Sequence, residues 1–305
     1  MNGIDVPLRT TSIVKVSGKI LDIPAGVKAS LEVGYDPTPN ASEGFPVTVA
    51  SDGSFVVPGF EPGKYTLRAE AGEGDEHRRS APLELEVGAT NVEHVELRLV
   101  PPFAISGHVE YEDEQARQAS KPPIEGLRGT ILKDRTVYLS ADMQAEVGVD
   151  DTFRLESVQP DRYHVSVFLG MAYVKAVSLG TVESDGDTLD VRNGAGDGSL
   201  IVLLSAARGT ISGTVSDSKG PVSGAMVALM RDHFSREVST DANGRYSLPD
   251  VHPGTYKLVA GDERVRDLWR DSDALADYKD VLVTVELHAG EMVTQDLKLS
   301  SAGKL

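Results

Sequence analysis

One pattern of turn and strand residues occurs three times in this chain of 305 residues, and it constrains the fold more than any other feature. Each copy holds a turn, a strand with an aromatic residue near its start, a second turn, and a strand containing a tyrosine, at residues 52–65, 150–163 and 243–256. The aromatic residues Phe55, Phe153 and Tyr246 lie 98 and 93 residues apart. This period is too long for a solenoid unit and suits a whole β-sandwich. We therefore predict an all-β chain of three tandem Ig-like or prealbumin-like β-sandwich domains in an elongated arrangement.

The predicted domains are residues 1–100, 101–205 and 206–305, and each is close to the commonest domain size. The connections between them, residues 100–103 and 205–209, are too short to act as flexible tethers. Each domain opens on a similar strand that contains Ser17-Gly18, Ser106-Gly107 or Ser212-Gly213. Short apolar runs separated by Gly, Pro, Asn and Asp predict seven strands in the first domain, at residues 13–20, 29–35, 47–50, 54–57, 65–69, 83–87 and 92–99.

Charge and composition exclude several classes of function. The formal net charge is −17, and the three domains contribute −6, −8 and −3, so phosphate backbones and anionic lipid surfaces would be repelled. Because cysteine is absent, no disulfide, thiolate metal site or cysteine nucleophile is available. No apolar run reaches the roughly 18 residues of a membrane helix, and residues 1–7 do not resemble an export signal. We interpret the chain as a piece of a longer protein, monomeric in isolation, without nucleic-acid partners or membrane insertion.

The glycines of the pattern have a conformational explanation. Gly53 and Gly244 suit the positive φ of a tight turn, and Gly63 or Gly254 lets the chain reverse after a proline. The middle copy has Asp151 and Asp161 at these positions. Because aspartate reaches the left-handed region less readily than glycine, we expect a different turn type or strain there.

The third copy resembles a carboxypeptidase regulatory-like domain, which has a transthyretin-like or prealbumin-like sandwich. The matching segments are residues 210–215 (TISGTV), 220–227 (GPVSGAMV), 240–246 (TDANGRY) and 251–256 (VHPGTY). The first copy keeps the middle of the pattern and the Pro-Gly-x-Tyr segment. The resemblance implies a non-catalytic accessory module of an exported bacterial protein, in the periplasm, on the cell surface or secreted.

Two segments depart from the repeat and are the places to look for specific chemistry. Residues 111–130 read as a polar excursion that could form a mobile loop. Residues 261–280 contain a plausible helical turn capped by Asp271 or Ser272. This second segment also carries the only tryptophan, in an arrangement typical of a sugar-binding platform: Trp269 and Tyr278 as stacking aromatics, with Arg266 and Arg270 nearby. The alternative is that Trp269 anchors the insert onto its own sandwich.

Other patterns point only weakly to chemistry. Glu183, Asp185, Asp187 and Asp190 offer oxygen ligands for calcium but lack the EF-hand order. The glycine-rich segment 194–198 precedes a strand, whereas a phosphate cradle opens a helix. An isopeptide cross-link in the first domain would have to use Lys15, Glu70 and Asn91. The seven histidines lack metal-site spacing, and no nucleophile elbow is found.

The leading hypothesis is a non-catalytic spacer or protein-docking module of a larger exported protein, with no catalytic residue, cofactor or metal assigned. A carbohydrate-binding module is the second hypothesis. A hydrolase is the third, and it would need a site at a domain junction, for example Asp271 and Asp273 with Arg266 or Arg270. The partner, protein or glycan, is not identified by the sequence.

Overall fold

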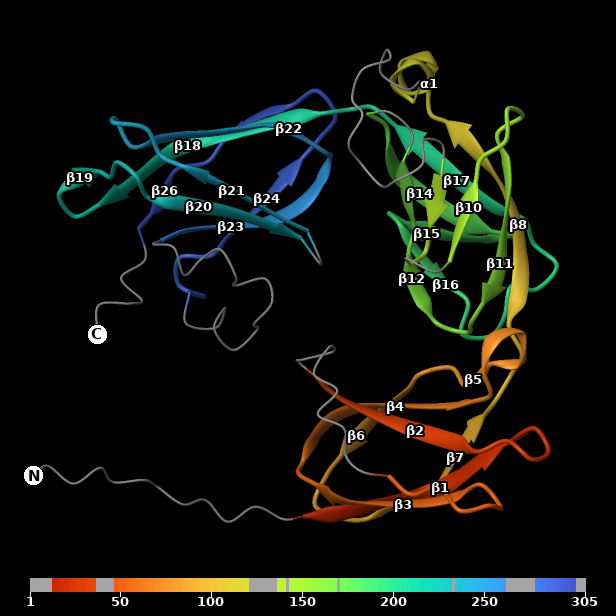
Figure 1. Cartoon of the computed structure of the whole chain (residues 1–305). Helices are drawn as coiled ribbons and strands as arrows, with labels where there is room; N and C mark the ends of the chain where they lie inside the picture. Colours follow the sequence, from red (N-terminus) through yellow and green to blue (C-terminus); the bar gives the residue numbers. More distant parts are fainter. Residues whose placement is uncertain are drawn as a thin grey trace, which may run out of the picture. The chain divides into compact units, whose positions relative to one another are not determined.

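The structure of the chain is a computed structural model that describes residues 13–36, 47–120, 136–140, 143–168, 171–231, 234–261 and 278–299. The chain divides into two compact units, Met1–Ala206 and Ala207–Leu305. The first unit contains two separate hydrophobic cores, one within residues 14–99 and the other within residues 105–204. The three-domain division with its boundaries therefore stays a prediction, while the all-β class is confirmed (Figure 1).

The first sandwich, red to orange in Figure 1, places two sheets over one core. One sheet has the order β3-β1-β7, from β1 (Val14–Leu21), β3 (Ser54–Phe60) and β7 (Val92–Arg98). The other has the order β2-β4-β5 with β6 also paired to β4, from β2 (Ala29–Asp36), β4 (Gly63–Ala71), β5 (Arg78–Arg79) and β6 (Leu83–Val87). A 3-10 helix, η1 (Gly74–Glu76), precedes β5.

The second sandwich, yellow to green in Figure 1, has a five-stranded sheet and smaller sheets around its core. The large sheet has the order β11-β8-β17-β14-β15, from β8 (Phe103–Tyr111), β11 (Thr152–Val158), β14 (Tyr173–Leu179), β15 (Val182–Asp185) and β17 (Leu200–Ser205). The smaller sheets are β10-β9-β13 and β12-β16, from β9 (Thr136–Tyr138), β10 (Gln144–Glu146), β12 (Arg162–His164), β13 (Ser166–Phe168) and β16 (Thr188–Asp190).

The second unit is a sandwich of its own. One sheet is built on β18 (Gly209–Asp217), which pairs with β19 (Gly220–Pro221), β22 (Arg245–Val251), β25 (Met292–Thr294) and β26 (Leu297–Lys298). The other has the order β21-β20-β23-β24, from β20 (Met226–Arg231), β21 (Phe234–Ser239), β23 (Gly254–Gly261) and β24 (Val283–Leu287).

The opening strand has the same neighbours in all three copies. Strands β1, β8 and β18 each pair antiparallel with the strand of the repeated aromatic residue and parallel with a late strand of the same sandwich. The aromatic residue lies directly opposite the glycine of the opening strand, in the pairs Gly18–Phe55, Gly107–Phe153 and Gly213–Tyr246. A Cβ on any of these glycines would come within 1.9 to 2.4 Å of a carbonyl oxygen, on the parallel strand for Gly18 and Gly107 and at Gln295, directly after β25, for Gly213. The repeated glycine and aromatic residue are thus a packing requirement.

The tight turn before the aromatic strand keeps one conformation in all three copies. Gly53, Asp151 and Gly244 have φ values of 85°, 63° and 73°. Of the two alternatives expected at Asp151, a different turn type or strain, the second holds, because the left-handed conformation is imposed on a non-glycine residue. The Asp151 carboxylate accepts a 2.9 Å hydrogen bond from the Tyr111 hydroxyl and lies 3.7 Å from Arg117 Nη1. These contacts hold a backbone conformation that glycine would adopt more readily.

Two further expectations are corrected. Residues 47–50 were predicted to form a strand. Among the described residues they form only an isolated bridge, between Val49 and Phe55. The polar excursion after β8 begins with a short helix, α1 (Glu114–Ala119), capped by the Asp113 carboxylate, which accepts a 2.7 Å hydrogen bond from Ala116 N. Residues 121–130 of that excursion lie outside the described part of the chain. No helix in the described ranges is long and apolar enough to span a bilayer.

Candidate functional site

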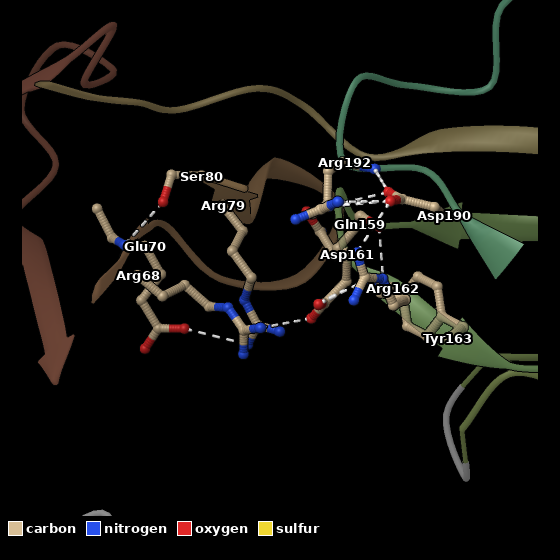
Figure 2. A network of polar contacts seen from close by, with 11 residues as sticks. Arg68, Glu70, Arg79, Ser80, Gln159, Asp161, Arg162, Tyr163, Asp190 and Arg192 are labelled. Carbon is tan, nitrogen blue, oxygen red and sulfur yellow. Dashed lines mark hydrogen bonds and ion pairs between the residues drawn. The ribbon is translucent and has the colours of Figure 1, made fainter. Parts of the chain in front are cut away.

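The candidate site is a polar contact between the first two sandwiches, and its central residue is Asp161. Asp161 follows Pro160 in the turn between β11 and β12, where the other copies have Gly63 and Gly254. Its Oδ2 accepts a 2.5 Å hydrogen bond from Nη2 of Arg68 on β4 of the first sandwich (Figure 2). The two side chains are 19% and 24% exposed. The residue that departs from the repeat thus docks the second sandwich onto the first.

Arg68 points outward because of the alternation of β4. Leu67 and Ala69 on either side of it are fully buried in the core, so the side chains of Thr66, Arg68 and Glu70 lie on the opposite face of the sheet. On this face Arg79 Nη2 donates to Glu70 Oε2 at 3.3 Å. A strand two residues long therefore supplies a second guanidinium beside the docking contact, as Figure 2 shows.

Gln159 makes a second direct contact between the sandwiches. Its side chain is buried, and Nε2 donates to the carbonyl oxygen of His77 at 3.4 Å. Its Oε1 and the Nε atoms of Arg68 and Arg79 are buried without a hydrogen-bond partner among the described residues. A buried polar atom left unpaired costs about 1–3 kcal/mol. These three atoms therefore reduce the free energy that the contact contributes to holding the two sandwiches together.

A second group of charges extends the contact. Asp190 on β16 accepts hydrogen bonds from Arg192 Nη2 at 2.6 Å and Nε at 3.1 Å, and Arg162 Nη2 lies 3.5 Å from the same carboxylate oxygen. Hydrogen bonding by Arg192 lowers the pKa of Asp190 to about 2. Arg192 also reaches Glu84 of the first sandwich at 3.8 Å. Opposite charges alternate along this contact, which favours one mutual orientation of the two sandwiches.

Tyr163 stays a neutral phenol beside this network. Burial, and then the neighbouring Asp161 carboxylate, raise the pKa of Tyr163 to about 12. Its hydroxyl donates to the carbonyl oxygen of Gln159 at 2.9 Å. The charged groups at the contact form ion pairs with each other. This arrangement suits docking better than proton transfer.

The residues predicted for a sugar platform are only partly placed. Arg266, Trp269 and Arg270 lie outside the described residues, as do Asp271 and Asp273 of the hydrolase hypothesis and Ser272 of the helical turn. Tyr278 is 5% exposed and packs with Ala228, Met230 and Val259 on the outer face of the β20–β23 sheet. This tyrosine therefore presents no open ring face, and the platform assignment stays a prediction.

The carboxylates considered for calcium have other partners. Asp187 lies 3.1 Å from His164 Nδ1, and Asp190 pairs with two arginines. Glu183 is exposed, and the side chain of Asp185 is outside the described set. Across the described ranges, no cluster of three or more His, Asp or Glu side chains is placed to hold a metal ion.

The glycine-rich segment 194–198 borders a cavity of about 640 Å³ beside β14, β15 and β16. It precedes β17, and the described residues around it include no helix that could orient a phosphate. This cavity therefore resembles a surface hollow between a hairpin and a loop.

The three residues considered for an isopeptide bond do not form a buried triad. The Lys15 side chain is exposed, and it is its backbone N–H that donates to Asn91 Oδ1 at 3.0 Å. Glu70 lies on the other sheet and pairs with Arg79.

Sequence reasoning did not identify the Arg68–Asp161 contact. The sequence did contain one indication of this contact. Asp161 is a charged residue at a turn position where the other two copies have glycine, and such a replacement suggests a specific interaction. Its partner lies 93 residues earlier, and no local pattern indicates such a distance.

Comparison with known proteins gives a family match for the third copy. Residues 210–300 match the carboxypeptidase regulatory-like domain family, so the predicted resemblance is confirmed there. No curated protein matches the sequence.

Among solved structures, the chain is similar to the Bacillus anthracis TIE protein, with 12% identity over 94% of this chain and 50% of that one, at a TM-score of 0.23. It is also similar to a Streptococcal ancillary pilin, with 10% identity over 95% and 100% and a TM-score of 0.29. A third is BcpA, the major pilin subunit of Bacillus cereus, with 11% identity over 95% and 100% and a TM-score of 0.23. The chain spans about half the length of the TIE chain.

Proposed function

We propose that this chain is a non-catalytic spacer and docking module of a larger exported bacterial protein. In this role the sandwiches hold other parts of the protein, or a partner protein, at a set separation. The observation that carries the proposal is the Arg68–Asp161 ion pair, which joins two consecutive sandwiches through partly buried charges.

The geometry of the contact supports a holding role. A flexible string of domains needs no polar groups matched across its joints. Here Arg68 contacts Asp161, the Gln159 amide contacts the His77 carbonyl, and Arg192 contacts Glu84. Three separate contacts resist rotation about any single one of them.

The backbone at the joint supports the same role. Arg79 and Val100 exchange two backbone hydrogen bonds of 3.2 Å, N–H to carbonyl in both directions. This ties β5 of the docking face to the segment that leads into β8. The docking face and the connection to the next sandwich are therefore held together.

Spin-label distances test the proposal directly, because the chain contains no cysteine to remove. Val56→Cys and Val182→Cys place labels on exposed positions of the first and second sandwiches. A spacer predicts one narrow distance distribution between these labels. Asp161→Asn combined with Arg68→Gln should broaden it.

The matched control is Arg98→Gln, which removes the exposed Arg98–Asp22 ion pair inside the first sandwich and should leave the distribution narrow. A second label pair within the first sandwich, Val56→Cys with Glu86→Cys, reports whether each variant keeps its fold. A broad distribution in the unaltered chain, unchanged by the Asp161 and Arg68 substitutions, would rule out the spacer role.

A further inference from the structure

The turn between β22 and β23, in the second unit, is surrounded by arginines. It is the third-copy equivalent of the turn that carries Gln159 and Asp161, since His252 and Gln159 accept the same hydrogen bond from Tyr256 and Tyr163. Arg231 Nη1 donates to the carbonyl oxygen of Pro253 at 3.3 Å. Arg236 Nη1 donates to that of Pro249. One guanidinium thus contacts the turn itself, and the other contacts the strand that leads into it.

Strand register explains why both side chains reach this turn. Arg231 follows Leu229 by two residues on β20, and Arg236 lies opposite Leu229 on β21. Leu229 is fully buried between the sheets, so both arginines extend along the inner face to the end of the sandwich.

The space for one guanidinium is built into the backbone. Arg231 lies over the ring of Tyr256, with its Cζ 5.1 Å from the ring centroid. A Cβ at Gly254, which has a φ of 147°, would lie 2.2 Å from Arg231 Nη1. The middle copy has Asp161 at this position, so the equivalent turns carry opposite charge in the two copies.

Most N–H groups of these two arginines donate no hydrogen bond to a described residue. Each guanidinium has five N–H groups, and each donates one hydrogen bond, to a backbone carbonyl. Within the described residues neither pairs with a carboxylate, whereas Arg68, Arg79, Arg162 and Arg192 in the first unit all do. In a chain with a net charge of −17, cations without carboxylate partners at one turn need an explanation.

Three arginines act electrostatically on His252 in this turn. Burial, followed by Arg208, Arg231 and Arg236, lowers the pKa of His252 to about 4, so His252 is neutral at pH 7. An anion placed between these guanidiniums would be favoured. Because the chain as a whole repels extended polyanions, a short acidic segment suits the turn better than a nucleic acid.

We propose that Arg231 and Arg236 form a docking site for the carboxylate side chains of an acidic segment of a partner polypeptide. A planar guanidinium matches a carboxylate through two parallel N–H donors, and two neighbouring guanidiniums match two neighbouring carboxylates. This site rests on the docking role proposed above and adds to it the chemistry of one partner.

The test titrates the full chain with hexaglutamate at low ionic strength and follows the arginine Nε–Hε signals by NMR. The signals of Arg231 and Arg236 should shift together and saturate, and hexaglutamine should leave them unmoved. Arg236→Gln should weaken binding about tenfold, since a charge-assisted hydrogen bond is lost. Arg231→Gln should have a similar effect. Arg245→Gln, an exposed arginine of the same unit, is the control and should bind as the unaltered chain does.

Bound peptide should also raise the pKa of His252 above its value of about 4, because a carboxylate offsets the surrounding arginines. A purely structural role for Arg231 and Arg236 would lower thermal stability in both variants while leaving hexaglutamate without effect on His252. That result, or shifts spread over Arg98 and Arg245 without saturation, would overturn the site. The spin-label experiment does not involve these residues, so the two proposals fail separately.

Discussion

The hydroxyl of Tyr163 donates a 2.9 Å hydrogen bond to the carbonyl oxygen of Gln159, four residues earlier in the chain. The other copies repeat the contact, from Tyr65 to Glu61 at 3.1 Å and from Tyr256 to His252 at 2.7 Å. Such a bond closes the turn that precedes the inner strand, as the tyrosine corner does in other sandwiches. The tyrosine of the repeat is therefore a turn clamp, and in the second sandwich it also supports the residue that contacts the first.

Removing this hydroxyl should destabilise each copy. Tyr163→Phe keeps the buried ring and loses the hydrogen bond, so we expect a loss of about 1 kcal/mol in the free energy of unfolding. Tyr256→Phe should have a similar effect in the second unit. Urea unfolding monitored by NMR signals assigned to each sandwich checks this, and an unchanged midpoint for the altered copy would refute the clamp.

Gly107→Ala should be far more damaging than an ordinary glycine substitution. The new Cβ would lie 2.4 Å from the Leu200 carbonyl oxygen and 2.5 Å from the Phe153 ring, so strands β8 and β17 would have to separate. We expect a cost of about 3 kcal/mol or more. Gly88→Ala, whose Cβ would meet nothing within 4 Å, is the control and should change the unfolding free energy by less than about 0.5 kcal/mol.

The Arg68–Asp161 pair should show a measurable coupling energy. Both side chains are more than three-quarters buried, so a double-mutant cycle of Arg68→Gln and Asp161→Asn should give about 1 kcal/mol. The same cycle on the exposed pair Arg98 and Asp22 should give less. Equal coupling energies in the two cycles would argue against a special role for the joint.

Acid should weaken the second sandwich through Asp190. Its pKa in the folded chain is about 2, below the ordinary 3.8, because Arg192 hydrogen-bonds the ionised form. The stability from this group is complete above about pH 4 and is lost as the pH falls toward 2. The carboxylate is partly exposed, so we expect a small effect. Urea midpoints at pH 5 and pH 2.5 should fall less in Asp190→Asn than in the unaltered chain.

His252 should make the second unit more stable as the pH rises from about 4 to 6.5. In the folded chain its pKa is about 4, mainly because of burial, while an unfolded histidine binds a proton near 6.5. The unfolded state therefore holds more protons across this range, and unfolding is favoured as the pH falls. His252→Gln should flatten the dependence. An NMR titration of His252 with a midpoint near 6.5 would contradict the assignment.

The tandem sandwich pattern could be predicted from local residues because local backbone geometry requires them. Gly53, Asp151 and Gly244 all adopt positive φ, and Val95, Leu97 and Leu99 are buried on one face as their alternation predicts. Six of the seven strands predicted for the first sandwich are present. Turn conformation, strand alternation and core packing depend on neighbours a few residues apart, so a single sequence carries them.

The sequence by itself determined the sheet-sandwich class, the recurring turns and the resemblance of the third copy to a carboxypeptidase regulatory-like domain. Only the tertiary structure decided that Asp161 contacts Arg68 and that Arg231 and Arg236 approach the turn at His252. The physical reason is that these contacts join strands and turns that pairing brings together across tens of residues. Strand order and strand register determine which side chains contact each other on the outer face or at the end of a sandwich. Strand order and register are properties of the whole sheet.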